Sequence, residues 1–119
     1  MIRTQRNVFL IALALSLAII YVYWGLWDHQ FIIVDDNTYV TNNPQVQSGL
    51  TIESTKWAFT TTRAEFWHPL TWLSYMLDTE LFGVNPAGYL FTNLILHVLN
   101  SMLLFLVLNK FTGSRLPRP

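Results

Sequence analysis

The sequence contains no cysteine and little charge, and both shortages exclude broad classes of protein. Without cysteine there is no disulfide scaffold. Charged residues make up 12% of the 119 residues, about half of the ~25% typical of a soluble domain, and the net charge is zero. A charge-rich disordered tail and a basic nucleic-acid-binding arm are therefore excluded, and no nucleic-acid partner is expected. Because apolar residues make up 52%, the composition indicates a membrane protein.

Two long segments contain no Asp, Glu, Lys or Arg: residues 8–27 (20 residues) and 87–108 (22 residues). At about 1.5 Å per residue, helices over them would reach roughly 30 and 33 Å, which matches a hydrocarbon core of roughly 30 Å. The sequence thus predicts an all-α membrane protein in three parts. These are a cytoplasmic N-terminus with a first transmembrane helix (1–27), a structured extracytoplasmic loop with short surface helices (28–86), and a second transmembrane helix with a cytoplasmic tail (87–119).

The charges are distributed very unevenly along the chain. All seven acidic residues lie between the two spans, where Lys56 and Arg63 are the only basic residues, so the loop carries 2 − 7 = −5. The other five basic residues flank the spans: Arg3, Arg6, Lys110, Arg115 and Arg118. By the positive-inside rule both termini are cytoplasmic and the loop faces the periplasm or a lumen. The location expected is the bacterial inner membrane, with the loop periplasmic. A cleaved signal peptide is the alternative, but the aromatic end of the first span offers no small-residue cleavage site.

The loop is rich in aromatic residues and is predicted to be folded. Asp35-Asp36-Asn37 and the stretch 41–44 have turn composition. Thr51 is predicted to cap a helix through Phe59, and Pro69 to begin a helix that stops at Gly83. One face of that second helix is predicted to contain five residues and to lie along the membrane surface: Leu70, Leu73, Met76, Leu77 and Leu81. Asn85-Pro86 repeats the helix-start signal for the second span, with Lys110 in its last turn and Gly113 as its end.

The second span carries a polar stripe of four residues that share one helical face: Asn93, His97, Asn100 and Ser101. Uncharged polar groups in membrane helices usually hydrogen-bond across a helix interface, which favours packing as their role. The alternative is that His97 contacts a substrate or relays protons, since ionisable residues at membrane depth are functional candidates.

The adjacent carboxylates Asp35 and Asp36 lie eight residues after the first span. In an extended segment their side chains would point to opposite faces, so only one could address a given site. One of them could act as a general base, which needs an ionised carboxylate within hydrogen-bond reach of a hydroxyl. On spacing alone, Asp-Asp-Asn is an ordinary turn, and this interpretation is favoured over a catalytic one.

Four ordered motifs carry a resemblance to a known family. They are the segment from Val34 to Pro44, the segment from Trp57 to Thr62, Trp67-His68-Pro69-Leu70-Thr71-Trp72-Leu73-Ser74, and Asn93-Leu94-Ile95-Leu96-His97. Together with an acidic pair at the start of the first loop, they resemble the C-type superfamily of integral membrane glycosyltransferases, which includes the protein O-mannosyltransferases. The similarity is greatest to its transmembrane tetratricopeptide-repeat proteins.

The resemblance implies transfer of a sugar from a polyprenyl-phosphate donor to a protein or glycan acceptor outside the cytoplasm, with inversion at the anomeric carbon. Asp35 matches the catalytic base. Asp36, where many relatives carry Glu, would orient the acceptor or bind a divalent cation; no other metal site and no further cofactor is expected. His68 would contact the donor phosphate or cap its helix. Arg63 would contact the same phosphate or remain a solvated charge.

Relatives of this kind have many more membrane helices that enclose the donor site. We therefore expect the chain to be an N-terminal fragment, inactive alone, whose partners include the bilayer and the remaining membrane helices of a parent enzyme. The alternative function is a small non-catalytic membrane scaffold that binds a partner protein through its loop. A soluble hydrolase using Asp35, Asp36 and His68 is disfavoured, because two spans leave too little soluble chain for a core.

Overall fold

The computed structural model describes residues 2–32 and 35–113. Every regular element in these two ranges is helical, which confirms the predicted all-α class. The elements are α1 (Ile2–Val22), the 3-10 helix η1 (Trp24–Asp28), the π-helix η2 (Asn37–Thr41), α2 (Pro44–Gln47), α3 (Ile52–Thr60), the 3-10 helix η3 (Arg63–Glu65), α4 (Pro69–Phe82) and α5 (Pro86–Gly113). Residues 33–34, which end the apolar stretch predicted before the acidic pair, lie outside the described residues.

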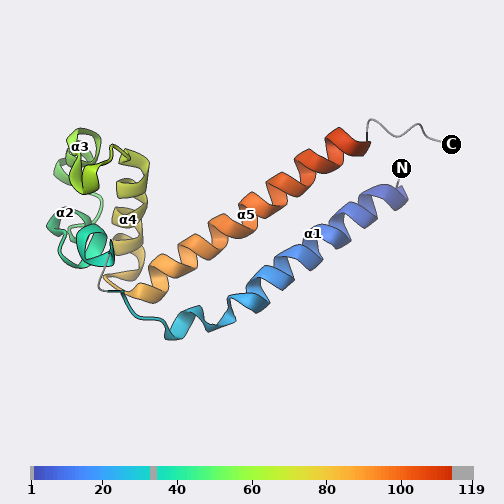
Figure 1. Cartoon of the computed structure of the whole chain (residues 1–119), viewed down its shortest axis with the longest axis horizontal. Coiled ribbons are helices and arrows are strands. Elements are labelled where there is room, and N and C mark those ends of the chain that lie inside the picture. The colour runs from blue at the N-terminus through green and yellow to red at the C-terminus, as the bar shows by residue number, and fades with distance from the viewer. Residues whose placement is uncertain (1, 33–34, 114–119) are drawn as a thin grey trace. The chain divides into compact units, whose positions relative to one another are not determined.

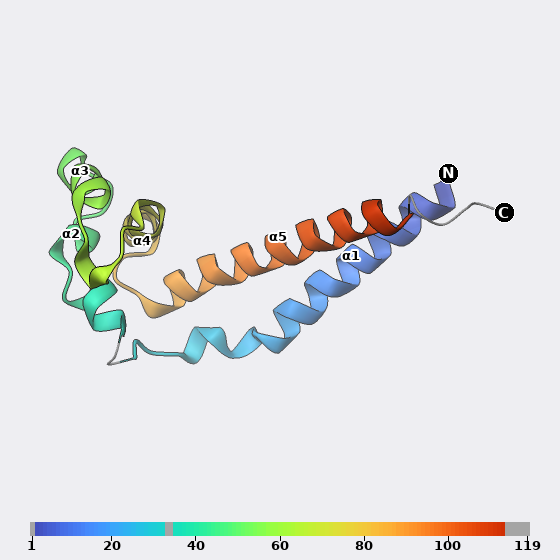
Figure 2. The ribbon, with the colours of Figure 1, turned by 45° about the horizontal axis from the view of Figure 1, so that its top comes forward.

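The chain forms two compact units. The first, here the α1–α5 unit, combines Met1–Gly25 with Asn93–Pro119, and the second, here the α2–α4 unit, is Leu26–Thr92. Within the first unit α1 and α5 run antiparallel and side by side (Figures 1 and 2). The hydroxyl of Ser16 lies 3.4 Å from the sulfur of Met102, and the rings of Tyr23 and His97 meet edge to face at 5.7 Å.

Two helical stretches are long and apolar enough to cross a membrane, Gln5–Asp28 and Pro86–Thr112. They contain the two segments predicted as spans. Their large apolar side chains are mostly exposed, as expected of residues that face lipid. The first stretch is not one uniform helix, because α1 ends at Val22 and the chain continues as the tighter η1 around Gly25.

The α2–α4 unit has a small core of four fully buried side chains: Val46, Ala58, Trp72 and Met76. They come from α2, α3 and α4, which pack beside one another (Figure 1). Tyr39, Trp57, Leu73 and Tyr75 cover this core. Trp72 is the largest buried side chain in the described residues, so α4 is the element around which the unit is built.

The helix ends follow the predicted signals. The hydroxyl of Thr51 accepts from the backbone N–H of Ser54 at 3.0 Å, and the Ser54 hydroxyl accepts from the N–H of Thr51 at 2.9 Å, so α3 begins with a capping box. α4 begins at Pro69 and is followed by Gly83 with φ +68°, a conformation that favours glycine. α5 begins at Pro86, with Lys110 in its last turn.

The predicted apolar face of α4 is divided in two by the structure. Met76 joins Trp72 and Pro69 on the buried side, whereas Leu70, Leu77 and Leu81 are exposed on another side. Residues 69, 72 and 76 lie on one helical face, and residues 70, 77 and 81 lie on another, because residues three, four or seven positions apart fall on the same side of a helix. The prediction that Met76 shares a face with those leucines is therefore wrong, because the unit's own core takes that side of the helix.

Candidate functional site

The two adjacent carboxylates have different environments. Asp36 is half-buried, and its Oδ2 accepts from the backbone N–H of Ile32 at 2.7 Å, whereas Asp35 is exposed. The backbone at Asp36 is helical (φ −58°, ψ −30°), so the extended geometry considered for the pair does not apply to this residue. Successive side chains on a helix point about 100° apart, so the two carboxylates still face different surroundings. Asp36 anchors the preceding chain, and Asp35 is left accessible.

A π-helical turn follows the pair directly. The N–H of Asn42 donates to the carbonyl oxygen of Asn37 at 2.8 Å, and the Thr41 hydroxyl donates to the Asn37 side-chain oxygen at 2.7 Å. π-helical turns are rare and frequently occur at functional sites. The sequence predicts an ordinary turn here. Composition alone does not distinguish an ordinary turn from a π-helical one.

Side chains from later elements bind the carbonyl oxygens of this turn. Gln47 Nε2 donates to the carbonyls of Val40 at 3.0 Å and Thr41 at 2.7 Å. Arg63 Nε donates to the carbonyl of Thr38 at 3.2 Å, and its Nη2 donates to that of Asn42 at 2.9 Å. The irregular turn leaves carbonyl oxygens without their usual helical donors, and Gln47 and Arg63 supply donors to them. These hydrogen bonds hold the turn in place beside Asp35 and Asp36. Arg63 has a structural role that neither sequence interpretation of this residue included.

His68 belongs to an aromatic cluster formed with Tyr39, Trp57, Trp72 and Tyr75. Its ring stacks on Trp72 at 4.9 Å and lies 5.7 Å from the ring of Tyr39, which stacks on Trp72 at 5.1 Å. His68 immediately precedes α4, but its side chain makes no capping hydrogen bond, so the capping alternative is wrong. Because Tyr39 lies in the π-helical turn, it connects the segment of the acidic pair with His68.

Three buried polar atoms of this unit have no hydrogen-bond partner among the described residues: Asn43 Nδ2, His68 Nε2 and Trp72 Nε1. Asn43 and Trp72 are fully buried. Unpaired buried polar groups are uncommon in folded proteins. The His68 nitrogen is the most relevant of them, since it belongs to a half-buried side chain and an imidazole N–H can donate a hydrogen bond to an anion.

Tyr75 places a phenol near the acidic pair. Burial raises the pKa of Tyr75, and the neighbouring Tyr39 and the charge of Asp36 raise this pKa further. The Tyr75 hydroxyl therefore remains protonated at neutral pH and is available as a hydrogen-bond donor.

The structure also reveals a buried carboxylate that the sequence reading missed. Asp78 of α4 is only 2% exposed, and the Thr92 hydroxyl donates to its Oδ1 at 2.5 Å. One turn away, the hydroxyls of Thr79 and Tyr89 are 2.5 Å apart. These two contacts join α4 to the first turns of α5. Burial raises the pKa of Asp78, and the Thr92 hydrogen bond opposes this effect.

The polar stripe on α5 is mainly exposed. Asn93, His97 and Asn100 are exposed and Ser101 is half-buried, and the ring of His97 contacts the ring of Tyr23. Across residues 2–32 and 35–113, no three His, Asp or Glu side chains gather as a metal site would require. The residues present therefore give no built cation site at Asp36.

No family model, no curated protein and no solved structure matches this chain.

Proposed function

We propose that this chain supplies the acceptor-activating segment of a membrane glycosyltransferase that uses a polyprenyl-phosphate sugar. The observation that supports it best is the division of roles in the acidic pair: Asp36 is hydrogen-bonded to the backbone, and Asp35 beside it is exposed. A general base must be ionised and accessible to the acceptor hydroxyl, which suits Asp35. The π-helical turn held by Arg63 and Gln47 fixes its position.

In this proposal the Asp35 carboxylate takes the proton of an acceptor hydroxyl. The hydroxyl oxygen then forms a bond to the anomeric carbon on the face opposite the donor, and the bond from that carbon to the phosphate oxygen breaks. Polyprenyl phosphate leaves with the electron pair, and the configuration is inverted. His68, whose Nε2 has no partner in the described residues, is the candidate contact for the departing phosphate.

The proposal places the loop on the periplasmic side of a bacterial inner membrane and both termini in the cytoplasm, as the distribution of charge favours. Further membrane helices of a parent protein would complete the donor site, because the reaction requires a site that excludes water. The proposed partners of the chain are therefore these further membrane helices and the protein or glycan acceptor.

The second candidate is a membrane scaffold that binds a protein through its loop. It is favoured by the exposed aromatic side chains Phe66 and Trp67, which are 67% and 65% exposed next to an exposed Leu70. Exposed apolar groups that gather in this way mark interaction surfaces. A scaffold of this kind needs neither carboxylate of the acidic pair.

The test uses the protein expressed from its complete reading frame, in native membranes, with radiolabelled polyprenyl-phosphate sugars. Asp35→Asn should lower transfer about 10²- to 10⁴-fold while donor binding survives, because the amide keeps the shape but cannot accept the proton. Asp28→Asn, which changes another exposed acid near the first span, is the matched control and should leave transfer unchanged.

Asp36 gives a second comparison. Asp36→Glu should retain much of the transfer, and Asp36→Ala should reduce it because the N–H of Ile32 loses its acceptor. Near-normal transfer by folded, membrane-inserted Asp35→Asn would exclude Asp35 as the base. Absence of transfer from every donor, together with a protein partner whose binding requires Phe66 and Trp67, would favour the scaffold.

A further inference from the structure

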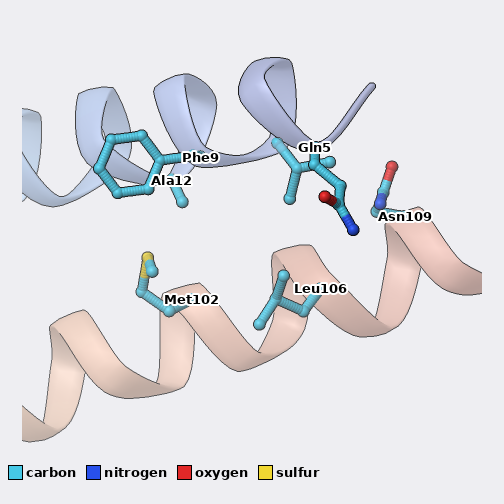
Figure 3. A pocket seen from close by; sticks show the side chains of 7 residues that line it. Gln5, Phe9, Ala12, Met102, Leu106 and Asn109 are labelled. Carbon is cyan, nitrogen blue, oxygen red and sulfur yellow. The ribbon is translucent and has the colours of Figure 1, made fainter. Parts of the chain in front are cut away.

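The α1–α5 unit contains a groove at the end opposite to Tyr23 and His97. Its volume is about 500 Å³, within the range of roughly 300–1,000 Å³ that is usual for small-molecule sites. Phe9 and Ala12 of α1 face Met102 and Leu106 of α5 across it, and Gln5 and Asn109 lie at one end (Figure 3).

The wall of the groove is almost entirely apolar. Ala12 is small and buried, so at its position α1 leaves space between the two helices beside Phe9. Met102 is unbranched and adapts to the shape of a neighbouring chain. Such a wall suits a hydrocarbon chain, because it supplies no polar partner that a headgroup or a polar ligand would need.

The sequence of the α1–α5 unit carries charge of one sign, with basic residues and no Asp or Glu. Among its described side chains the basic ones are Arg6 and Lys110. Arg6 and Lys110 are exposed and directly follow Gln5 and Asn109 in the sequence, so both cations lie at the same level along their helices as the end of the groove that the two amides mark. Basic residues beside the ends of membrane helices attract anionic lipid headgroups.

We propose that this groove binds an anionic phospholipid, with one acyl chain between α1 and α5 and its phosphate held by Arg6 and Lys110. The charge complementarity selects this occupant over a second copy of the chain, which would bring the same basic residues together. This proposal does not depend on the glycosyltransferase function, since the groove and the acidic pair belong to different units.

The experiment measures lipid retention by native mass spectrometry. The whole chain is purified in detergent, mixed with equal amounts of phosphatidylglycerol and phosphatidylcholine that have identical acyl chains, and the bound lipids are counted. Phosphatidylglycerol should be retained preferentially. Replacing Arg6 and Lys110 together by Gln should lower this preference by about fivefold for each charge removed. Lys56→Gln, which removes a basic residue of the other unit, should leave it unchanged.

A second pair of variants tests the groove itself. Ala12→Phe fills the space opposite Met102 and should reduce the retention of both lipids, whereas Ala12→Ser leaves the space open and should not. Circular dichroism would verify that each variant keeps its helices. If Ala12→Phe leaves lipid retention unchanged but abolishes chemical cross-linking between chains, the occupant is a second copy. Equal retention of the two lipids by the unaltered chain would overturn the proposal.

Discussion

The Arg63 guanidinium joins two carbonyl oxygens that lie four residues apart, donating to Thr38 at 3.2 Å and to Asn42 at 2.9 Å. Thr38 lies near the start of the π-helical turn and Asn42 directly follows its end, so one side chain connects the turn beside the acidic pair to the chain just before α4. A planar guanidinium can hold two acceptors at once in a way that a lysine ammonium cannot.

Replacing Arg63 should therefore destabilise the α2–α4 unit. We expect Arg63→Gln and Arg63→Lys each to lower the free energy of unfolding by about 1–3 kcal/mol, since hydrogen bonds from a charged donor are lost. The measurement is thermal unfolding followed by tryptophan fluorescence. Lys56→Gln, which removes an exposed charge, is the control. If Arg63 instead bound a donor phosphate, the substitutions would raise the KM for the donor and leave the unfolding midpoint unchanged.

The exposed side of α4 leads to a prediction about the membrane surface. Leu70 is 76% exposed and Leu81 is 64% exposed, and both lie on the side away from Trp72. At 14 residues, or about 21 Å, α4 is too short to cross a bilayer upright, so we expect these leucines to contact the lipid interface.

Single cysteines carrying a fluorophore can test this contact, because the sequence contains no other thiol. Labels at Leu70→Cys and Leu81→Cys should be quenched strongly by spin-labelled lipids with the nitroxide near the headgroup. A label at Ser48→Cys, an exposed polar position after α2, should be quenched weakly. Equal quenching at the three positions would show that α4 does not lie on the membrane.

Local signals predicted the helix ends of this chain well. Thr51, Pro69, Gly83 and Pro86 each act at one position through a hydrogen bond or a backbone angle, so their effects can be recognised without the fold. The two helical stretches suited to a membrane could likewise be recognised from their length and lack of charge.

Features that depend on distant residues could not be predicted in this way. The π-helical turn is held by Gln47 and Arg63, which lie beyond it in the chain. Met76 is buried because α2 and α3 pack against one side of α4, and helical periodicity does not say which apolar side that will be. The hydrogen-bond partner of the buried Asp78 is Thr92, which lies 14 residues later in the chain.

The distribution of charge predicts the topology of the chain. A single cysteine in place of Asn43 should place its thiol on the periplasmic side, and one in place of Ser114 should place it in the cytoplasm. Asn43 is buried, so Ser48→Cys, which is exposed in the same segment, is the second periplasmic reporter. In intact cells a membrane-impermeant maleimide should label the loop and should label position 114 only after lysis. Labelling of position 114 from outside would contradict both the topology and the proposed function.

The buried carboxyl of Asp78 should make the free energy of unfolding depend on pH. Burial raises the pKa of this carboxyl in the folded protein, so the folded state binds the proton more tightly than the unfolded state. The stability that the protonated Asp78 contributes is fully present below the pKa of this group in the unfolded chain, about 3.9. It is lost as the pH rises through the higher pKa of this group in the folded protein. At neutral pH the ionised Asp78 therefore lowers the free energy of unfolding.

Asp78→Asn should remove this loss of stability at neutral pH, because the amide oxygen can still accept from the Thr92 hydroxyl but carries no charge. Unfolding midpoints measured at intervals from pH 4 to pH 7 should fall less for Asp78→Asn than for the unaltered protein. Asp78→Ala removes the same charge but leaves the Thr92 hydroxyl without its acceptor, and should be less stable than Asp78→Asn at every pH. Asp28→Asn, which changes an exposed acid, should reproduce the unaltered pH dependence. An Asp78→Asn profile parallel to the unaltered one would mean that Asp78 does not titrate with folding, and that its hydrogen bond to Thr92 offsets its burial.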